Sequence, residues 1–193
     1  KIFMFANTDW YLFNFRLSLI KSLIGLGHEV TVLSPAGLFQ SRLRVEGVRC
    51  LTIALERKGR LVRGDITGLY QLLSIYAREK PDVVHHFTIK AVVYGMIAAK
   101  LARIPFQINA ITGLGYLFTG DKVRSSLTRR VVVFCLQKLL RGEKCCTVVQ
   151  NQDDKEALLN LGISRTESLF LIPGSGVNLE KFTPSDVQKT GNV

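Results

Sequence analysis

Short apolar runs rich in β-branched residues alternate with helix-periodic segments along the whole chain, and this alternation constrains the fold more than any other feature. Strand-like runs occupy 1–7, 29–34, 48–55, 82–86, 106–111, 145–150 and 169–172. Between them, apolar residues recur at helical spacing at about 13–24, 38–46, 66–76, 90–102, 124–140 and 153–161. Apolar strands joined by helices form parallel sheets that are covered on both faces. The pattern predicts an α/β fold, a Rossmann-like doubly wound parallel sheet of about seven strands.

The size and composition of the chain suit one compact domain followed by a tail. Its 193 residues are 47% hydrophobic and 21% charged, so one substantial core can form. After Pro173 the sequence becomes polar and rich in turn-forming residues. We therefore expect a domain over 1–173 and the start of an interdomain linker at 174–193.

The excess of basic residues favours anionic partners. There are 26 lysines and arginines against 15 acidic residues, a formal net charge of +11. No zinc spacing and no RNA-binding aromatic signature accompanies this charge, so we expect no nucleic-acid partner. The segment 56–63 (ERKGRLVR) and the arginines of the helix predicted at 124–140 are candidates for contact with an anionic membrane surface. The apolar run 131–134 places apolar groups on every face of that helix, and burial is favoured over membrane contact.

Several absences narrow the expected location and chemistry. The four cysteines, at 50, 135, 145 and 146, form no CxxC pair and have no histidine at metal-ligand spacing, so we expect reduced thiols and no metal. The longest apolar stretches are far shorter than the roughly 20 residues that span a bilayer. The chain also opens directly on an apolar strand without a secretory pattern. We therefore expect a cytoplasmic protein, with any membrane association peripheral.

The segment that follows the first strand is the first candidate site, because ligands of doubly wound sheets bind beyond the carboxyl ends of the strands. This segment, 7–16, contains no glycine, which argues against the pyrophosphate loop of a nicotinamide or flavin enzyme. It offers Asp9, Trp10, Tyr11 and Arg16 as candidate acceptor-binding residues. Aromatic faces suit sugar rings, and a guanidinium near a helix start suits a phosphate. Ordinary packing of the two aromatic rings against the helix is an equally good interpretation.

A histidine pair ends the fourth strand. Adjacent strand residues point to opposite sides, so at most one of His85 and His86 faces the cleft. That histidine would position or deprotonate an acceptor hydroxyl. Lys90, at the start of the next helix, is a candidate phosphate ligand.

Two glycines follow the fifth strand, in the segment 109–120. Thr112, Gly113 and Gly115 are candidate acceptor-binding residues, because glycines at the carboxyl edge of a strand let a ligand approach the backbone. A plain turn that needs the conformational freedom of glycine explains them equally well.

Four segments together resemble the N-terminal domain of family 4 retaining glycosyltransferases, especially bacterial enzymes that extend polyprenyl-diphosphate-linked glycans. They are NFRLSLIKSL, ITGLGYLFT, VVQNQDDKEALLNLGI and IPGSGVNLEKFTP. The resemblance implies one half of a GT-B architecture, in which the first domain binds the acceptor and a second domain beyond Val193 binds the nucleotide-sugar donor. The full-length enzyme would transfer a hexosyl or N-acetylhexosaminyl group from a UDP-sugar, with retention, to a lipid-linked saccharide in capsule, O-antigen or protein-glycosylation pathways. This chain alone would be inactive.

The resemblance also implies roles for particular residues. His86 and Lys90 fall at acceptor-side positions, and Gly174, Ser175 and Gly176 would border the interdomain cleft and the donor. Retention would proceed without a protein nucleophile, and no metal or other cofactor is implied. The chain departs from many relatives in its glycine-free first segment. A two-domain epimerase or phosphorylase of similar architecture, a flavodoxin-like binding module and a nucleic-acid-binding protein are the alternatives.

Overall fold

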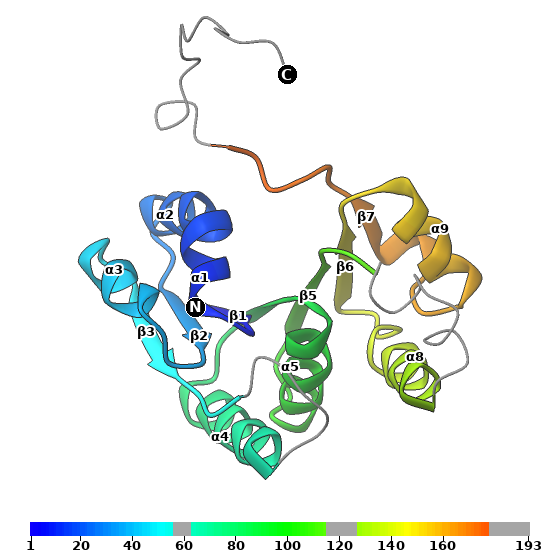
Figure 1. Ribbon diagram of the computed structural model, residues 1–193, viewed down its shortest axis with the longest axis horizontal. Coiled ribbons are helices and arrows are strands. Elements are labelled where there is room, and N and C mark those ends of the chain that lie inside the picture. The colour runs from blue at the N-terminus through cyan, green and yellow to red at the C-terminus, as the bar shows by residue number, and fades with distance from the viewer. Residues whose placement is uncertain (56–62, 115–126, 178–193) are drawn as a thin grey trace, which may run out of the picture.

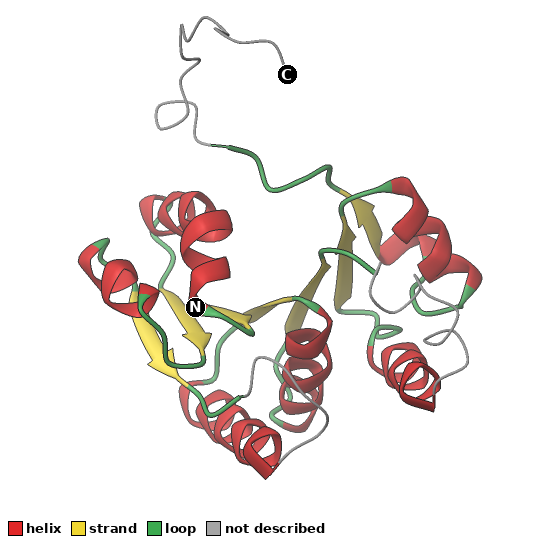
Figure 2. Cartoon of the chain, viewed as in Figure 1, coloured by secondary structure: helices red, strands yellow, loops and turns green. Residues whose placement is uncertain are grey.

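A seven-stranded, all-parallel sheet forms the centre of the protein (Figure 1, Figure 2). The computed structural model describes residues 1–55, 63–114 and 127–177. The strands follow the order β3-β2-β1-β4-β5-β6-β7. They are β1 (Ile2–Ala6), β2 (Val30–Ser34), β3 (Arg49–Thr52), β4 (Val83–Phe87), β5 (Phe106–Ile111), β6 (Cys145–Val149) and β7 (Leu169–Leu171). This sheet confirms the predicted fold class.

Helices cover both faces of the sheet. They are α1 (Asp9–Tyr11), the π-helical turn η1 (Leu12–Arg16), α2 (Leu17–Gly25), α3 (Phe39–Val45), α4 (Arg63–Glu79), α5 (Ile89–Leu101), α8 (Leu127–Leu139), α9 (Gln152–Asn160) and the 3-10 turn η2 (Thr166–Ser168). The helices α1 to α3 pack on one face of the sheet, and α4, α5, α8 and α9 pack on the other (Figure 1).

The core follows from the alternation of side chains along each strand. In β1, Phe3 lies in a cluster with Tyr76 of α4, whereas the next residue, Met4, lies in a cluster with Leu12 and Ile20 on the opposite face. All five side chains are fully buried. A strand whose two sides are both buried reads as a continuous apolar run, which is why the sequence pattern identified these strands.

Helix begins at Asp9, almost directly after β1 and a few residues before the helical spacing predicted from about residue 13. The side chain of Thr8 caps this helix, its Oγ1 accepting a hydrogen bond from the Tyr11 backbone N–H at 3.1 Å. A hydroxyl at the N-cap stabilises a helix start by satisfying a backbone donor. Asp9, Trp10 and Tyr11 therefore stand on a rigid helical turn.

The α8 helix also differs from expectation, because it is buried on one side only. Leu136, and Leu140 just past the helix end, pack into the core, whereas Val131 and Phe134 are 47% and 58% exposed. The β3 strand is likewise shorter than predicted, with its ladder to β2 spanning Arg49 to Thr52.

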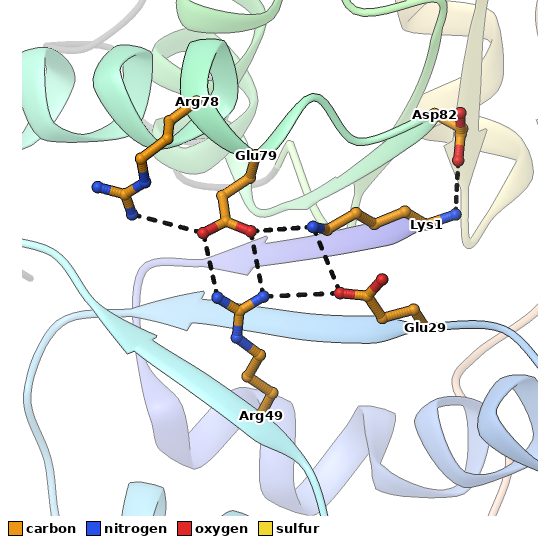
Figure 3. A network of polar contacts seen from close by, with 6 residues as sticks. All are labelled: Lys1, Glu29, Arg49, Arg78, Glu79 and Asp82. Atoms are coloured by element: carbon orange, nitrogen blue, oxygen red, sulfur yellow. Dashed lines mark hydrogen bonds and ion pairs between the residues drawn. The ribbon is translucent and has the colours of Figure 1, made fainter.

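An ion-pair network joins the amino ends of the first strands to α4 (Figure 3). Glu79 lies at its centre, 2.9 Å from the Nζ of Lys1 and 3.1 Å from an Nη of Arg49. The Arg49 guanidinium and then the Lys1 ammonium lower the pKa of Glu79 to about 2. This network lies at the edge opposite to the candidate site, so it bears on the fold rather than on binding.

Candidate functional site

The carboxyl ends of β1 and β4 are adjacent at the point where the strand order reverses. β1 pairs with both β2 and β4, and Ala6 lies beside Phe87. The chain runs outward from this point in both directions along the sheet. Crevices at such switch points are the usual ligand sites of doubly wound folds. The α1–η1 turn follows β1 and the first residues of α5 follow β4, and we call the position that they border the crevice.

Arg16 of η1 is held in a fixed orientation at this crevice. Its Nη2 and Nε donate hydrogen bonds to the hydroxyl of Tyr11 at 2.6 and 3.2 Å. The guanidinium carbon lies 4.7 Å from the ring centroid of Phe87 and 5.3 Å from that of Tyr11. Within the described part of the chain, no carboxylate forms an ion pair with it. An oriented guanidinium without a carboxylate partner suits a phosphate.

His85 stands on the same side of β4 as Phe87, and the two ring centroids are 4.0 Å apart. Its Nε2 is buried and has no hydrogen-bond partner among the described residues. Burial, followed by the charges of His86 and Arg16, lowers the pKa of His85 to about 3. At neutral pH His85 is therefore an uncharged imidazole with one unused nitrogen.

Thr88 adds a second unused polar atom where β4 passes into α5. Its φ angle is +75°, which is strained for a β-branched residue. Its Oγ1 is buried and makes no hydrogen bond within the described ranges. Sequence reasoning missed Thr88, because backbone strain leaves no mark in a residue pattern. Buried polar atoms without partners are unusual, and a bound group or a water molecule is one way to satisfy them.

His86 does not face this crevice, so of the two candidate histidines only His85 stands on the crevice side of β4. Its side chain is fully buried on the other face of the sheet. Nδ1 lies 2.8 Å from Oδ1 of Asn109, and Nε2 lies 3.2 Å from the hydroxyl of Tyr76. Burial lowers the pKa of His86 to about 4 despite the hydrogen bond to Asn109. The ring fills a slot under α5, and its role is structural.

The carboxylate of Asp9 makes its hydrogen bonds to backbone groups of the fold and not toward the crevice. One carboxylate oxygen accepts hydrogen bonds from the backbone N–H groups of Phe39 and Gln40, at 2.7 and 3.1 Å, where α3 begins. The other accepts from the N–H of Trp10 at 2.8 Å. A carboxylate at a helix N-terminus satisfies backbone donors and complements the helix dipole. Both carboxylate oxygens of Asp9 thus serve the fold, and its acceptor-binding role stays a prediction.

Trp10 presents an exposed aromatic surface beside the crevice, together with Phe15. Both side chains are 43% exposed, and their rings meet edge to face with centroids 5.4 Å apart. Tyr11 packs against Phe87 and Arg16, whereas Trp10 contacts Phe15 and leaves much of its ring exposed. Phe15 was missed, because the π-helical turn brings residues five positions apart onto one side.

Lys90 is paired with a buried carboxylate. Its Nζ lies 2.8 Å from Oδ1 of Asp65 on α4, whose side chain is 1% exposed. Because of this ion pair, the charge of Lys90 is compensated within the fold, which argues against the predicted phosphate contact. Burial and the same Asp65 raise the pKa of the nearby Tyr94 to about 12.

The segment after β5 fits the turn interpretation. Thr112 is half-buried, and Gly113 has a φ angle of +137°, a region that favours glycine. The N–H of Leu114 then donates to both carboxylate oxygens of Asp154, at 3.3 and 3.4 Å. Gly115 lies outside the described residues.

The residues after β7 run past the carboxyl end of β6. Ser175 accepts a hydrogen bond through its Oγ from Nε2 of Gln150 at 3.2 Å. Gly174 and Gly176 on either side have φ angles of +70° and +71°, so this strand exit requires glycines. Across 1–55, 63–114 and 127–177, no cluster of histidine, cysteine and acidic residues suits a metal ion, and no helix is long and apolar enough to cross a bilayer.

Solved structures with the same fold belong to GT-B glycosyltransferases and epimerases. Anabaena HepE in complex with UDP and glucose superposes with a TM-score of 0.66 at 18% identity, over 96% of this chain and 47% of that one. A UDP-GlcNAc 2-epimerase from Methanocaldococcus jannaschii superposes with a TM-score of 0.62 at 16% identity, over 90% and 45%. At these identities the likeness shows the fold, one half of a GT-B architecture.

A family model described as "Glycosyl transferase 4-like" matches residues 1–141, and the chain belongs to this family. The N,N'-diacetylbacillosaminyl-diphospho-undecaprenol alpha-1,3-N-acetylgalactosaminyltransferase of Campylobacter jejuni is 25% identical over 177 residues, which are 92% of this chain and 46% of that protein. The UDP-Gal:alpha-D-GlcNAc-diphosphoundecaprenol alpha-1,3-galactosyltransferase of Escherichia coli is 28% identical over 123 residues, 63% of this chain and 30% of that protein. The chain thus spans less than half of the length of these relatives. The resemblance seen in the sequence is confirmed.

Proposed function

We propose that this chain is the acceptor-binding half of a glycosyltransferase that moves a sugar from a UDP-sugar to a polyprenyl-diphosphate-linked saccharide. The names of the two curated relatives support the lipid-diphosphate acceptor. The observation that carries the proposal is the oriented guanidinium of Arg16 over the ring of Phe87, together with Nε2 of His85 and Oγ1 of Thr88, which have no hydrogen-bond partner among the described residues. One cation with nearby hydrogen-bonding atoms suits the oxygens of a phosphorylated substrate.

Each group in the crevice has a distinct role in this proposal. Arg16 binds a phosphate oxygen, and Thr88 donates a hydrogen bond from its hydroxyl. The exposed rings of Trp10 and Phe15 contact the acceptor sugar or the first isoprene units, because aromatic faces cover apolar sugar surfaces. His85 positions a hydroxyl rather than removing its proton, since a pKa of about 3 makes it a poor base at neutral pH.

The donor is bound by the part of the protein that lies outside this chain, as the half-length coverage of the relatives suggests. The transferred group is a hexosyl or N-acetylhexosaminyl group, and its anomeric configuration is retained. The two halves work by positioning and by stabilising the charge of the departing diphosphate, without a metal.

The test uses the full-length protein with labelled UDP-sugars and a polyprenyl-diphosphate-linked sugar, counting label in the organic extract. Arg16→Ala removes a charge-assisted contact and is expected to lower kcat/KM by about 10- to 100-fold. The matched control is Arg42→Ala, since Arg42 also lies over an aromatic ring, 5.0 Å from the centroid of Phe39, and has no role in the proposed site. Equal losses in the two variants would remove Arg16 from the site.

The same assay separates transfer from epimerisation. Label that stays in the aqueous phase with an inverted UDP-sugar would replace the proposal with the epimerase alternative. Such an outcome is physically reasonable, because an epimerase shares the fold.

A further inference from the structure

The outer face of α8 combines basic and apolar side chains that the candidate site does not use. Its exposed residues repeat at helical spacing and form what we call the α8 stripe: Arg130, Val131, Phe134, Lys138 and Arg141, the last just beyond the helix end. Residues four apart lie on one side of a helix, so the stripe is continuous. Figure 1 places α8 at the rim of the molecule, where this face is open among the described residues.

The charge of the stripe is of one sign. No acidic residue occurs between 127 and 142, so the basic side chains are not neutralised along the helix. Lys138 lies over the ring of Phe134, with its Nζ 5.6 Å from the centroid. Lys100 of α5 adds another cation, because its Nζ donates a hydrogen bond to the backbone carbonyl of Lys138 at 2.8 Å.

The apolar members decide between possible anionic partners. Val131 and Phe134 are about half exposed and lie between the cations. Against a nucleic-acid backbone these side chains would meet phosphates and gain nothing, whereas at a bilayer they enter the boundary between head groups and acyl chains. A helix with cations flanking exposed apolar residues is typical of surface-bound membrane proteins.

We infer that the α8 stripe docks the protein on an anionic phospholipid bilayer. The cations contact the phosphates of the head groups, and Phe134 and Val131 insert beneath them. This inference concerns binding alone and holds whether or not the protein transfers sugars. It names the surface through which a peripheral enzyme would reach an acceptor that is itself embedded in lipid.

The test is sedimentation of the purified chain with two kinds of vesicle, one of phosphatidylcholine alone and one of equimolar phosphatidylcholine and phosphatidylglycerol. We expect binding to the anionic vesicles that weakens as salt is added, and little binding to the neutral ones. The triple variant Arg130→Ser, Lys138→Ser, Arg141→Ser should lower partitioning roughly 100-fold, since each basic residue near such a surface contributes about 1 kcal/mol. Phe134→Ser should lower it about tenfold.

The matched control removes the same charge elsewhere, through Arg42→Ser, Lys80→Ser and Arg165→Ser, all at exposed positions. This variant should bind nearly as well as the parent chain. The comparison then shows whether binding depends on the position of the basic residues or only on the net charge. Equal losses in the two triple variants would overturn the inference. So would tighter binding to a DNA duplex than to the anionic vesicles, abolished by the α8 substitutions. Circular dichroism confirms that every variant is folded.

Discussion

The ring of His86 lies directly against Gly95 of α5, so closely that a Cβ built on the glycine would be 2.3 Å from Cδ2 of the imidazole. The slot that accepts the histidine is therefore made by the missing side chain of the helix above it. Tyr76 and Asn109 complete the slot by contacting the two ring nitrogens. These contacts show that the fold itself holds the side chain of His86, one of the two histidines considered as candidate catalytic residues.

Gly95→Ala should destabilise the fold, because the new methyl group forces either the helix or the buried ring to move. Overpacking of this kind costs about 1–3 kcal/mol. Urea denaturation measures the loss. Gly25→Ala is the control, since Gly25 is also helical and has no atom within 4 Å of a built Cβ. It should leave stability unchanged or raise it by roughly 0.5–1 kcal/mol, and equal effects at the two glycines would contradict the packing described here.

Acidification should weaken the fold through the two buried histidines. Burial lowers the folded-state pKa of His86 to about 4 and that of His85 to about 3, from 6.5. The unfolded chain therefore binds more protons below pH 6.5, so stability is complete above that pH and declines as the pH falls toward 4. For His86 alone the loss is on the order of 3 kcal/mol. The slope of unfolding free energy against pH should flatten in His86→Gln but not in His28→Gln, which changes an exposed histidine.

Asp9→Ala should lower stability by about 1–2 kcal/mol, because two backbone N–H groups at the start of α3 lose their acceptor. Asp9→Asn retains an acceptor oxygen and should lose less. Thermal or urea unfolding of the two variants checks the order. In the full-length enzyme, a loss of transfer in Asp9→Asn without any loss of stability would instead restore Asp9 to the binding site.

Lys90→Met should be strongly destabilising, by about 3–5 kcal/mol, because it leaves the buried carboxylate of Asp65 without the ammonium 2.8 Å away. The double variant Lys90→Met, Asp65→Asn removes the charge as well and should recover much of the stability. A double-mutant cycle from urea denaturation measures the coupling between the two residues. Additive effects would show that the pair does not hold α4 to α5.

The arrangement of strands and helices was predictable from particular stretches of sequence. The run from 106 to 111 has the same bounds in the structure as in the prediction, and the helix from about 90 to 102 begins and ends within one residue of α5. Both follow from hydrophobic periodicity, which depends on each element burying a face. The candidate site stays a prediction, and local patterns could not have foreseen that Asp9, His86 and Lys90 each have a partner within the fold.

The sequence by itself determined the parallel sheet, since apolar strands alternating with helices can bury their surface in few other ways. It also determined that His85 and His86 point to opposite sides, because strand residues alternate. Only the tertiary structure decided that His86 enters the slot under Gly95 while His85 joins Phe87 near the crevice. That choice depends on which helix packs on which face of β4. Such packing joins residues that are distant in the chain, so no local sequence pattern predicts it.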